Sequence, residues 1–376
     1  MRIAIDAREL VGRPTGVGRY LAELLRAWGD LPGAHAHEFI LCAPDRVPLP
    51  APQGRLAGFR VEAMSAAGNG TAWEQFTLPR LVARAGADVL FAPGYTGPVL
   101  GSLARPLSAA VPMVVTIHDV SFAAHPEWFS WREGRRRRIV TRLTARKAAR
   151  VITVSDFSKQ EIVRHLGVPA SKVEVVYSGL TSLRGTRITD HTDMVVLYVG
   201  SLFNRRHIPE LVAGFELLAA RHPSARLDLV GDNRTRPYID VGRLIAHSPA
   251  RDRIRARAYV PDDELARLYR EARAFVFLSE YEGFAMTPLE AIGSGVPVVL
   301  LDTDVAREIY GPAATYVERP DPALVAEGLE RALFDEEERT RTLSAAATQL
   351  ERYSWRDCAQ RTLQVLLACG RHNAEF

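Results

Sequence analysis

Short apolar runs alternate with longer amphipathic stretches along this chain, and that alternation constrains its fold more than any other feature. Such a pattern is typical of parallel strands joined by crossover helices. In the first half we expect strands at residues 2–6, 39–43, 88–91, 113–117, 151–154 and 173–177. In the second half we expect them at residues 194–200, 227–231, 254–259, 274–278 and 298–301. Each half therefore predicts one Rossmann-like α/β domain.

The polar segment 184–193 contains Gly185, has no periodicity and separates the two halves, as a domain linker does. It predicts an N-terminal domain over 1–183 and a C-terminal domain over 194–355. The last stretch, 356–376, reads as a helix with no strand after it, and on its own pattern it can close either domain. Ligands of such folds bind at the carboxyl ends of the strands, so we expect the site in the cleft between the domains.

Composition excludes several classes of protein. The chain is 47% hydrophobic and 24% charged, which is ordinary for a folded globular protein. No apolar run approaches the roughly 18 residues of a membrane span, and Asp6 comes too early for a secretory signal. We therefore expect a cytoplasmic protein. A net charge of +4 indicates no nucleic-acid partner, and the three scattered cysteines are predicted to be buried thiols.

The densest motif is SEYEGFAMTPLEA at 279–291, which follows a predicted strand. Thr287 suits an N-cap, Pro288 the first helical position and Glu290 the third position of a capping box, so a helix is expected to begin there. The free N–H groups at that helix start favour a phosphate, and Gly283 would let a ligand approach the backbone. Taken alone, Glu290 is only a capping acid and Glu282 only a loop carboxylate.

Glu282, seven intervening residues and Glu290, within EGFAMTPLEAIGSGVPVV, resemble the E-x7-E signature of the retaining GT-B glycosyltransferases of family four, the group 1 family. The resemblance implies two Rossmann-like domains facing across a cleft and a nucleoside-diphosphate sugar as donor. It also implies that the C-terminal helix, 356–376, crosses back to the N-terminal domain.

The resemblance assigns site residues along the chain. It implies catalytic roles for Glu282, which binds the sugar hydroxyls, and for His118, which contacts the donor sugar near the reacting carbon. It implies donor binding by Gly16, Val17, Gly18, Arg205, Arg206, Tyr259, Gly283, Phe284, Ala285, Met286, Thr287 and Glu290. Arg206 stands where the family has lysine, which keeps the charge but changes the hydrogen-bonding geometry. Without the family resemblance, the residues Gly16–Gly18 would be interpreted as a tight turn, and His118 would be interpreted as a structural histidine.

These residues suit sugar transfer because positive charge develops at the anomeric carbon and negative charge on the leaving diphosphate. Arg205, Arg206 and the helix start can hold the diphosphate, so we expect neither a metal nor another cofactor. The sequence Asp302-Thr303-Asp304 matches a D-x-D metal motif, but we interpret it as an N-cap.

A basic run over 132–150 holds eight arginines and Lys147 against a single Glu133. Ile139, Val140 and Leu143 form an apolar stripe, which predicts a helix packed on the first domain with a solvated basic face. The other interpretation is peripheral contact with anionic lipids at the inner face of the membrane, or with a polyprenyl-diphosphate acceptor.

The sequence thus predicts a retaining, metal-independent hexosyltransferase that moves a sugar, with mannose preferred, to a glycan or lipid-linked glycan acceptor. One alternative is a non-catalytic scaffold that binds nucleotide sugars at a membrane surface. The other is a phosphorylase or sugar-phosphate synthase of the same fold, which would need further basic residues in the N-terminal half of the cleft.

Overall fold

The computed structural model describes residues 1–12, 16–47, 58–65, 70–100, 111–181 and 194–371. The chain divides into two compact units. Unit 1 comprises Met1–Gly179 together with Ser354–Phe376, and unit 2 comprises Leu180–Tyr353. The predicted linker, 184–193, lies outside the described residues.

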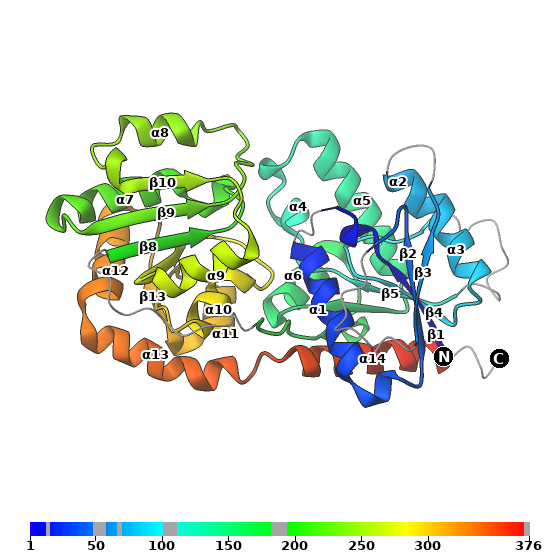
Figure 1. The fold of residues 1–376 in the computed structure, drawn as a ribbon. Helices are drawn as coiled ribbons and strands as arrows, with labels where there is room; N and C mark the ends of the chain where they lie inside the picture. The colour runs from blue at the N-terminus through cyan, green and yellow to red at the C-terminus, as the bar shows by residue number, and fades with distance from the viewer. Residues whose placement is uncertain (13–15, 48–57, 66–69, 101–110, 182–193, 372–376) are drawn as a thin grey trace. The chain divides into compact units, whose positions relative to one another are not determined.

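Unit 1 is built on a parallel sheet of seven strands in the order β3-β2-β1-β4-β5-β6-β7 (Figure 1). The strands are β1 (Arg2–Asp6), β2 (Glu38–Ala43), β3 (Phe59–Ala63), β4 (Val89–Ala92), β5 (Met113–Thr116), β6 (Arg150–Thr153) and β7 (Val173–Val175). Its helices are α1 (Gly16–Asp30), α2 (Gly70–Ala72), α3 (Leu78–Arg84), α4 (Ser121–Ala124), α5 (Trp131–Lys147), α6 (Asp156–Leu166) and α14 (Trp355–Arg371).

Unit 2 has a parallel sheet of six strands in the order β10-β9-β8-β11-β12-β13. The strands are β8 (Met194–Val199), β9 (Ala225–Val230), β10 (Ile254–Arg257), β11 (Ala274–Phe277), β12 (Val298–Leu301) and β13 (Ala314–Val317). Its helices are α7 (Ile208–Arg221), α8 (Val241–His247), α9 (Asp262–Glu271), α10 (Met286–Gly293), α11 (Asp304–Tyr310), α12 (Pro322–Phe334) and α13 (Glu336–Leu350).

Both sheets confirm the predicted fold class of two Rossmann-like domains. Central strands such as β11 (AFVF) and β12 (VVLL) are buried at every residue, because helices cover both faces of a parallel sheet. The sequence analysis missed the edge strands β3 and β13. β3 is only partly buried and carries charged residues at alternate positions, whereas β13 has four residues and directly follows a turn that contains Pro312.

Helix α14 packs against α1 and completes the core of unit 1 (Figure 1). The Trp28 indole Nε1–H of α1 donates to the Ala359 carbonyl at 2.9 Å. Cys358 and Leu366 are buried in the same cluster as Ile3 of β1. All three cysteines are buried thiols, as predicted. Among the described residues, no helix is long and apolar enough to cross a bilayer.

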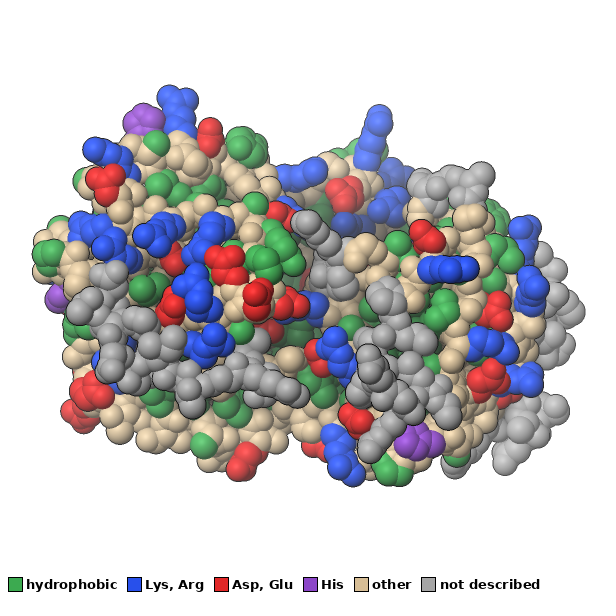
Figure 2. All heavy atoms as spheres, viewed as in Figure 1, with side chains coloured by type: hydrophobic (Ala, Val, Ile, Leu, Met, Phe, Trp, Pro, Cys, Tyr) green, Lys and Arg blue, Asp and Glu red, His purple; other side chains and the backbone are tan. Residues whose placement is uncertain are grey.

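The predicted apolar stripe of the basic helix was wrong. In α5, Ile139 is 47% exposed and Leu143 is 41% exposed. The buried positions are instead small or hydroxyl-bearing: Gly134, Thr141, Thr144 and Ala145. Small residues allow a close approach, and the Thr144 hydroxyl accepts a hydrogen bond from Gly97 N–H at 3.3 Å. Figure 2 shows Lys and Arg side chains gathered in the region of α5.

Candidate active site

The strand order of unit 2 reverses between β8 and β11, and the loops that follow these two strands meet at this point. The loop after β8 carries Arg205 and Arg206, and the loop after β11 carries Glu282. The two loops are joined directly, since Glu280 N–H donates to the Arg205 carbonyl at 3.0 Å. Three of the predicted site residues are therefore brought together at the switch point of the sheet.

Arg206 and Glu282 form a nearly buried ion pair. The guanidinium donates to Glu282 Oε1 from Nε at 3.0 Å and from Nη2 at 2.7 Å, and Nη1 donates to the Ser201 carbonyl at 2.7 Å. Burial alone lowers the pKa of Arg206, but the Glu282 carboxylate and Tyr198 raise it, and the net shift is upward. Arg206 is therefore charged at every working pH.

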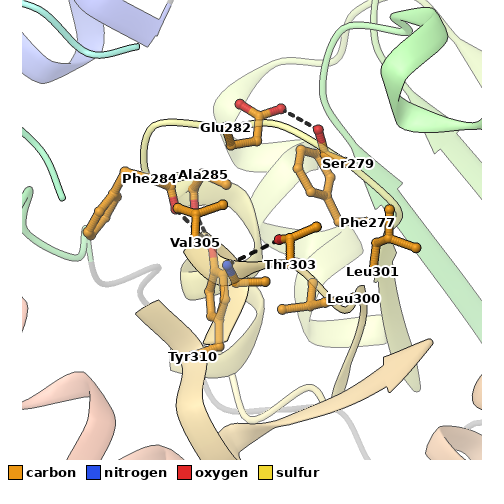
Figure 3. Close-up of a pocket in the computed structure, with 11 residues that line it drawn as sticks. Phe277, Ser279, Glu282, Phe284, Ala285, Leu300, Leu301, Thr303, Val305 and Tyr310 are labelled. Carbon is orange, nitrogen blue, oxygen red and sulfur yellow. Dashed lines mark hydrogen bonds between the residues drawn. The ribbon is translucent and has the colours of Figure 1, made fainter. Parts of the chain in front are cut away.

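The remaining contacts of this cluster fix its orientation. The Ser279 hydroxyl donates to Glu282 Oε1 at 2.8 Å (Figure 3), so this bond and the two from Arg206 fall on the same carboxylate oxygen. The Arg205 guanidinium carbon lies 4.5 Å from the centre of the Phe203 ring, and its Nε is 3.9 Å from Glu282 Oε1. A residue larger than glycine would clash at position 200, because a Cβ on Gly200 would lie 2.7 Å from Arg206 Nη1.

The predicted start of α10 was wrong by two residues. The helix begins at Met286 after Ala285, whose φ is 62°, and no side chain caps it. Thr287 lies inside the first turn and so cannot act as the N-cap. A non-glycine residue in the left-handed region is strained and is kept only when its surroundings hold it. The Tyr310 hydroxyl of α11 does so by donating to the carbonyls of Ala285 and Phe284 (Figure 3).

Glu290 faces α9, within unit 2. It is only 5% exposed, and its Oε2 accepts a hydrogen bond from the Tyr269 hydroxyl at 3.0 Å. The capping-box role predicted for it is therefore wrong.

Three other predicted donor-binding residues also lie in unit 2. Tyr259, which follows β10, is 58% exposed, and Gly283 and Phe284 lie in the loop between β11 and α10.

The D-x-D sequence caps a helix, as predicted, but through its central residue. The Thr303 hydroxyl accepts from Ala306 N–H at 3.3 Å at the start of α11. Both oxygens of Asp302 accept hydrogen bonds from the Arg307 guanidinium at 2.7 Å. Asp302 is therefore paired with Arg307, and Asp304 lies in the first turn of α11.

In unit 1, His118 lies two residues after the end of β5, between two tyrosine rings. Its ring centre lies 4.9 Å from that of Tyr20 and 5.6 Å from that of Tyr95. The ring Nε2 is 2.8 Å from the Pro93 carbonyl oxygen. Burial lowers the pKa of His118, although the Pro93 carbonyl and the Asp119 carboxylate act in the opposite direction. Asp119 itself accepts from the Tyr95 hydroxyl at 2.7 Å.

The glycine segment at 16–18 does not form a loop after β1. Gly16, Val17 and Gly18 instead make the first turn of α1, so the interpretation of this segment as a tight turn was wrong. A Cβ added at Gly16 would meet no described atom within 4 Å. The space beside this helix start is therefore open to a ligand as far as the described residues reach.

The carboxyl end of β1 carries a second buried ion-pair cluster. Arg8 is 2.7 Å from Asp6 Oδ2 through Nη2 and 3.1 Å from Glu74 Oε2 through Nη1. Asp6 and Glu74 are both buried. One guanidinium is therefore balanced by two carboxylates at this edge of unit 1.

Sequence reasoning missed the tyrosines and Ser279 that support these groups. Tyr20, Tyr95, Tyr269 and Tyr310 each contact a predicted site residue or its backbone. The position of Tyr95, three residues after the buried strand β4, was a usable signal. The other three lie within helices, where an aromatic residue reads as core.

Known protein families account for most of the chain. Residues 14–181 match the family model described as Glycosyltransferase Family 4, and residues 183–349 match the one described as Glycosyl transferases group 1. The chain belongs to the group 1 glycosyl transferases. This transferase is 27% identical over 261 residues to O-antigen chain mannosyltransferase B of Escherichia coli, across 66% of this chain and 68% of that protein.

Two solved structures show the fold of this group 1 transferase. One is Anabaena HepE in complex with UDP and glucose, with a TM-score of 0.75, 18% identity and coverage of 97% of this chain and 98% of that one. The other is sucrose-phosphate synthase from Thermosynechococcus elongatus, with a TM-score of 0.74, 17% identity and the same two coverages. The fold is therefore GT-B, with two Rossmann-like domains.

Proposed function

We propose that this glycosyltransferase is a retaining hexosyltransferase that needs no metal. Its donor is a nucleoside-diphosphate sugar, with mannose the first candidate, and its acceptor is a hydroxyl of a glycan or lipid-linked glycan. The observation that carries the proposal is the cluster of Arg205, Arg206 and Glu282 at the switch point of unit 2. The mannosyltransferase relative from Escherichia coli favours mannose, and the Anabaena neighbour with UDP and glucose favours a nucleotide-sugar donor.

In the proposed mechanism, the guanidinium groups of Arg205 and Arg206 bind the diphosphate beside the N-terminus of α10. Glu282 accepts hydrogen bonds from sugar hydroxyls through Oε2, Glu290 binds the ribose hydroxyls, and His118 contacts the sugar. The bond from the anomeric carbon to the phosphate oxygen breaks, and its electron pair stays on the phosphate. The acceptor oxygen bonds to the anomeric carbon on the same face, and its proton passes to a phosphate oxygen. Each donor aimed at the leaving phosphate is worth about 3 kcal/mol in the transition state.

The charges of unit 1 favour a neutral acceptor over a phosphate-bearing one. A phosphorylase or sugar-phosphate synthase binds an anion as the second substrate and needs free positive charge for it. At the carboxyl end of β1 the Arg8 guanidinium is outnumbered by Asp6 and Glu74. A hydroxyl acceptor meets no such repulsion there.

The first test measures nucleotide release from UDP-, GDP-, dTDP- and ADP-sugars, each with chelator and then with Mg²⁺ or Mn²⁺. We expect slow hydrolysis of one donor, unaffected by chelator and lost in Glu282→Ala and His118→Ala. Glu280→Gln is the matched control, because Glu280 lies two residues away, is more exposed and pairs with His207. A strict metal requirement would contradict metal independence. Binding of a nucleotide without turnover of any donor, even with added glycan acceptors, would favour the non-catalytic alternative.

We also propose that α5 contacts an anionic membrane surface. Trp131 is 71% exposed, and Ile139 and Leu143 are exposed among the arginines of the same helix. Apolar side chains that insert between lipid head groups, with basic ones around them, are typical of peripheral membrane binding. Wild type should sediment with vesicles that contain 30% phosphatidylglycerol and remain free with phosphatidylcholine alone.

The double variant Ile139→Ser, Leu143→Ser should weaken vesicle binding about tenfold. Leu217→Ser is its control, because Leu217 is equally exposed but lies on α7 in unit 2. Equal binding of wild type and the double variant, or equal binding to both lipid mixtures, would contradict contact through α5.

A further inference from the structure

Two backbone N–H groups at the start of α10 have no hydrogen-bond acceptor within the part of the chain that the structure describes. They belong to Ala285 and Met286. N–H groups of this kind are the ones with which a helix start binds an anion. In the proposed mechanism the diphosphate of the donor lies beside this helix start, next to Arg205 and Arg206. The directions in which the two N–H groups point therefore matter for donor affinity.

The Tyr310 hydroxyl sets these directions through the carbonyls of the same peptide groups. Its O–H is shared between the Ala285 carbonyl and the Phe284 carbonyl, the latter at 3.3 Å (Figure 3). A trans peptide group is planar, so its C=O and N–H point in opposite directions. Because both carbonyls point toward Tyr310, the N–H groups of Ala285 and Met286 point away from it.

The conformation of Ala285 depends on this hydroxyl. Its φ of 62° and ψ of 90° lie in a region that disfavours a residue with a Cβ. Such strain persists only where neighbouring contacts hold the residue, and the bonds from Tyr310 grip the carbonyls on both sides of Ala285. Without them, Ala285 is expected to relax to an ordinary φ, which rotates both peptide groups.

Tyr310 is itself firmly held within unit 2. Its side chain is buried, and the carbonyl of the preceding Ile309 accepts hydrogen bonds from the Tyr353 hydroxyl at 2.8 Å and from Gln349 Nε2 at 2.6 Å. The Phe284 ring packs edge-on against the Tyr353 ring, with the centres 5.2 Å apart. Burial raises the pKa of Tyr310 well above its usual value, so the hydroxyl keeps its proton and stays a donor.

We propose that Tyr310 is a positioning residue for the donor diphosphate: its hydroxyl holds Ala285 in the left-handed conformation, so that the N–H groups of Ala285 and Met286 point at phosphate oxygens. This rests on the proposed function. The hydroxyl acts through the backbone and touches no substrate. Tyr310 therefore strengthens binding of the diphosphate and contributes nothing to binding of the nucleoside.

The backbone part of the proposal is tested without any ligand, by ¹³C spectra of the full chain labelled at alanine. The Ala285 signals are assigned by their disappearance in Ala285→Gly. Tyr310→Phe keeps the ring and removes the hydroxyl, so the Cα and Cβ shifts of Ala285 should move toward those of an ordinary φ. Tyr316→Phe is the matched control, because the Tyr316 hydroxyl also donates to two backbone carbonyls, those of Ala306 and Gly311. It should leave the Ala285 signals unchanged.

The phosphate part is tested by titration calorimetry with UDP, GDP, dTDP and ADP and with the matching nucleosides. For the nucleoside diphosphate that wild type binds most tightly, Tyr310→Phe should weaken binding about tenfold and leave affinity for the nucleoside unchanged. Tyr316→Phe should match wild type for both ligands. The double variant Ala285→Gly, Tyr310→Phe should regain most of the lost affinity, because glycine adopts a positive φ without the hydroxyl.

Four results would overturn the proposal: Ala285 signals that stay in place in Tyr310→Phe, equal losses of affinity for nucleoside and nucleoside diphosphate, no loss for either, or no regain in the double variant. A wild-type protein that binds none of the four nucleoside diphosphates would instead contradict the proposed function. Movement of the Ala285 signals in Tyr310→Phe would in that case still support the hold of Tyr310 on Ala285.

Discussion

The carboxyl edges of the two sheets carry opposite charge balances. At the edge of unit 2, the guanidinium groups of Arg205 and Arg206 face the single carboxylate of Glu282. At the edge of unit 1, the single guanidinium of Arg8 lies between the carboxylates of Asp6 and Glu74. Both clusters are largely shielded from water, where charge balance matters most.

This difference shows that sheet topology and ligand preference are set separately. Parallel order around a switch point determines where loops meet, and both units share it. The residues placed on those loops then decide whether the edge attracts an anion, as in unit 2, or disfavours one, as in unit 1. The proposed transfer of an uncharged sugar from a diphosphate to a hydroxyl is compatible with both charge balances.

Of all the changes considered, removal of positive charge from the Arg205–Arg206 cluster of unit 2 should have the largest effect, a loss of donor turnover. We expect Arg206→Gln to lower donor turnover about 10³-fold, because it removes a preorganised donor to the diphosphate and unpairs Glu282. Arg206→Lys keeps the charge and should lose only about tenfold. Steady-state nucleotide release measures both variants. Equal losses in the two would mean that geometry, and not charge, matters at this position.

Removing the charge at the centre of the unit 1 cluster should affect stability most. Arg8→Met leaves two buried carboxylates side by side and should reduce the free energy of unfolding by about 3 kcal/mol. Arg26→Met is the control, since Arg26 is exposed on α1 and pairs with Glu23, and its loss should be below about 0.5 kcal/mol. Urea unfolding at neutral pH compares them. Similar values would show that the Arg8 cluster is in contact with water.

A smaller effect on stability is expected at Glu290 of unit 2, because the hydroxyl of Tyr269 that donates to it is uncharged. Tyr269→Phe removes the hydroxyl that donates to Glu290 and should reduce the free energy of unfolding by about 1 kcal/mol. If Glu290 holds the donor ribose, the same variant should raise the donor KM several-fold. Unchanged KM with the expected loss of stability would confine Glu290 to a structural role.

The smallest expected effect is a pH dependence from His118. Burial lowers its pKa, so below the unfolded value of about 6.5 the unfolded chain takes up a proton that the folded chain resists. Stability of wild type relative to His118→Gln should therefore fall as the pH drops from 8 to 5. Paired thermal melts give this difference. A relative gain at low pH would mean that the folded ring is charged.

Most of the fold followed from hydrophobic patterning. Eleven strands were expected at positions where strands are found, because most of them are short apolar runs between polar segments. The two missed strands lie at sheet edges: β3 has charged residues at alternate positions, and β13 is a run of only four residues directly after a turn. The direction in which α5 packs was also missed, since small residues and threonines carry little hydrophobic signal but permit close approach.

The charged residues of the site could be predicted from the sequence, but the residues that hold them in place could not. Arg205, Arg206 and Glu282 lie together because each follows a strand at the switch point, which strand prediction already implies. The helix start at Met286 was not predictable, because the left-handed Ala285 depends on the Tyr310 hydroxyl, which comes from a different helix. Contacts between elements far apart in sequence leave no local pattern.

The return of the chain to unit 1 has a consequence for biosynthesis. Unit 2 is one continuous segment and can fold as soon as the ribosome has released it. Unit 1 cannot complete the burial of Trp28 until Ala359 and the rest of α14 have been made. The N-terminal half of the nascent protein is therefore translated first, but its folding is completed last. Until α14 is made, the apolar surface that this helix will cover is exposed and accessible to chaperones.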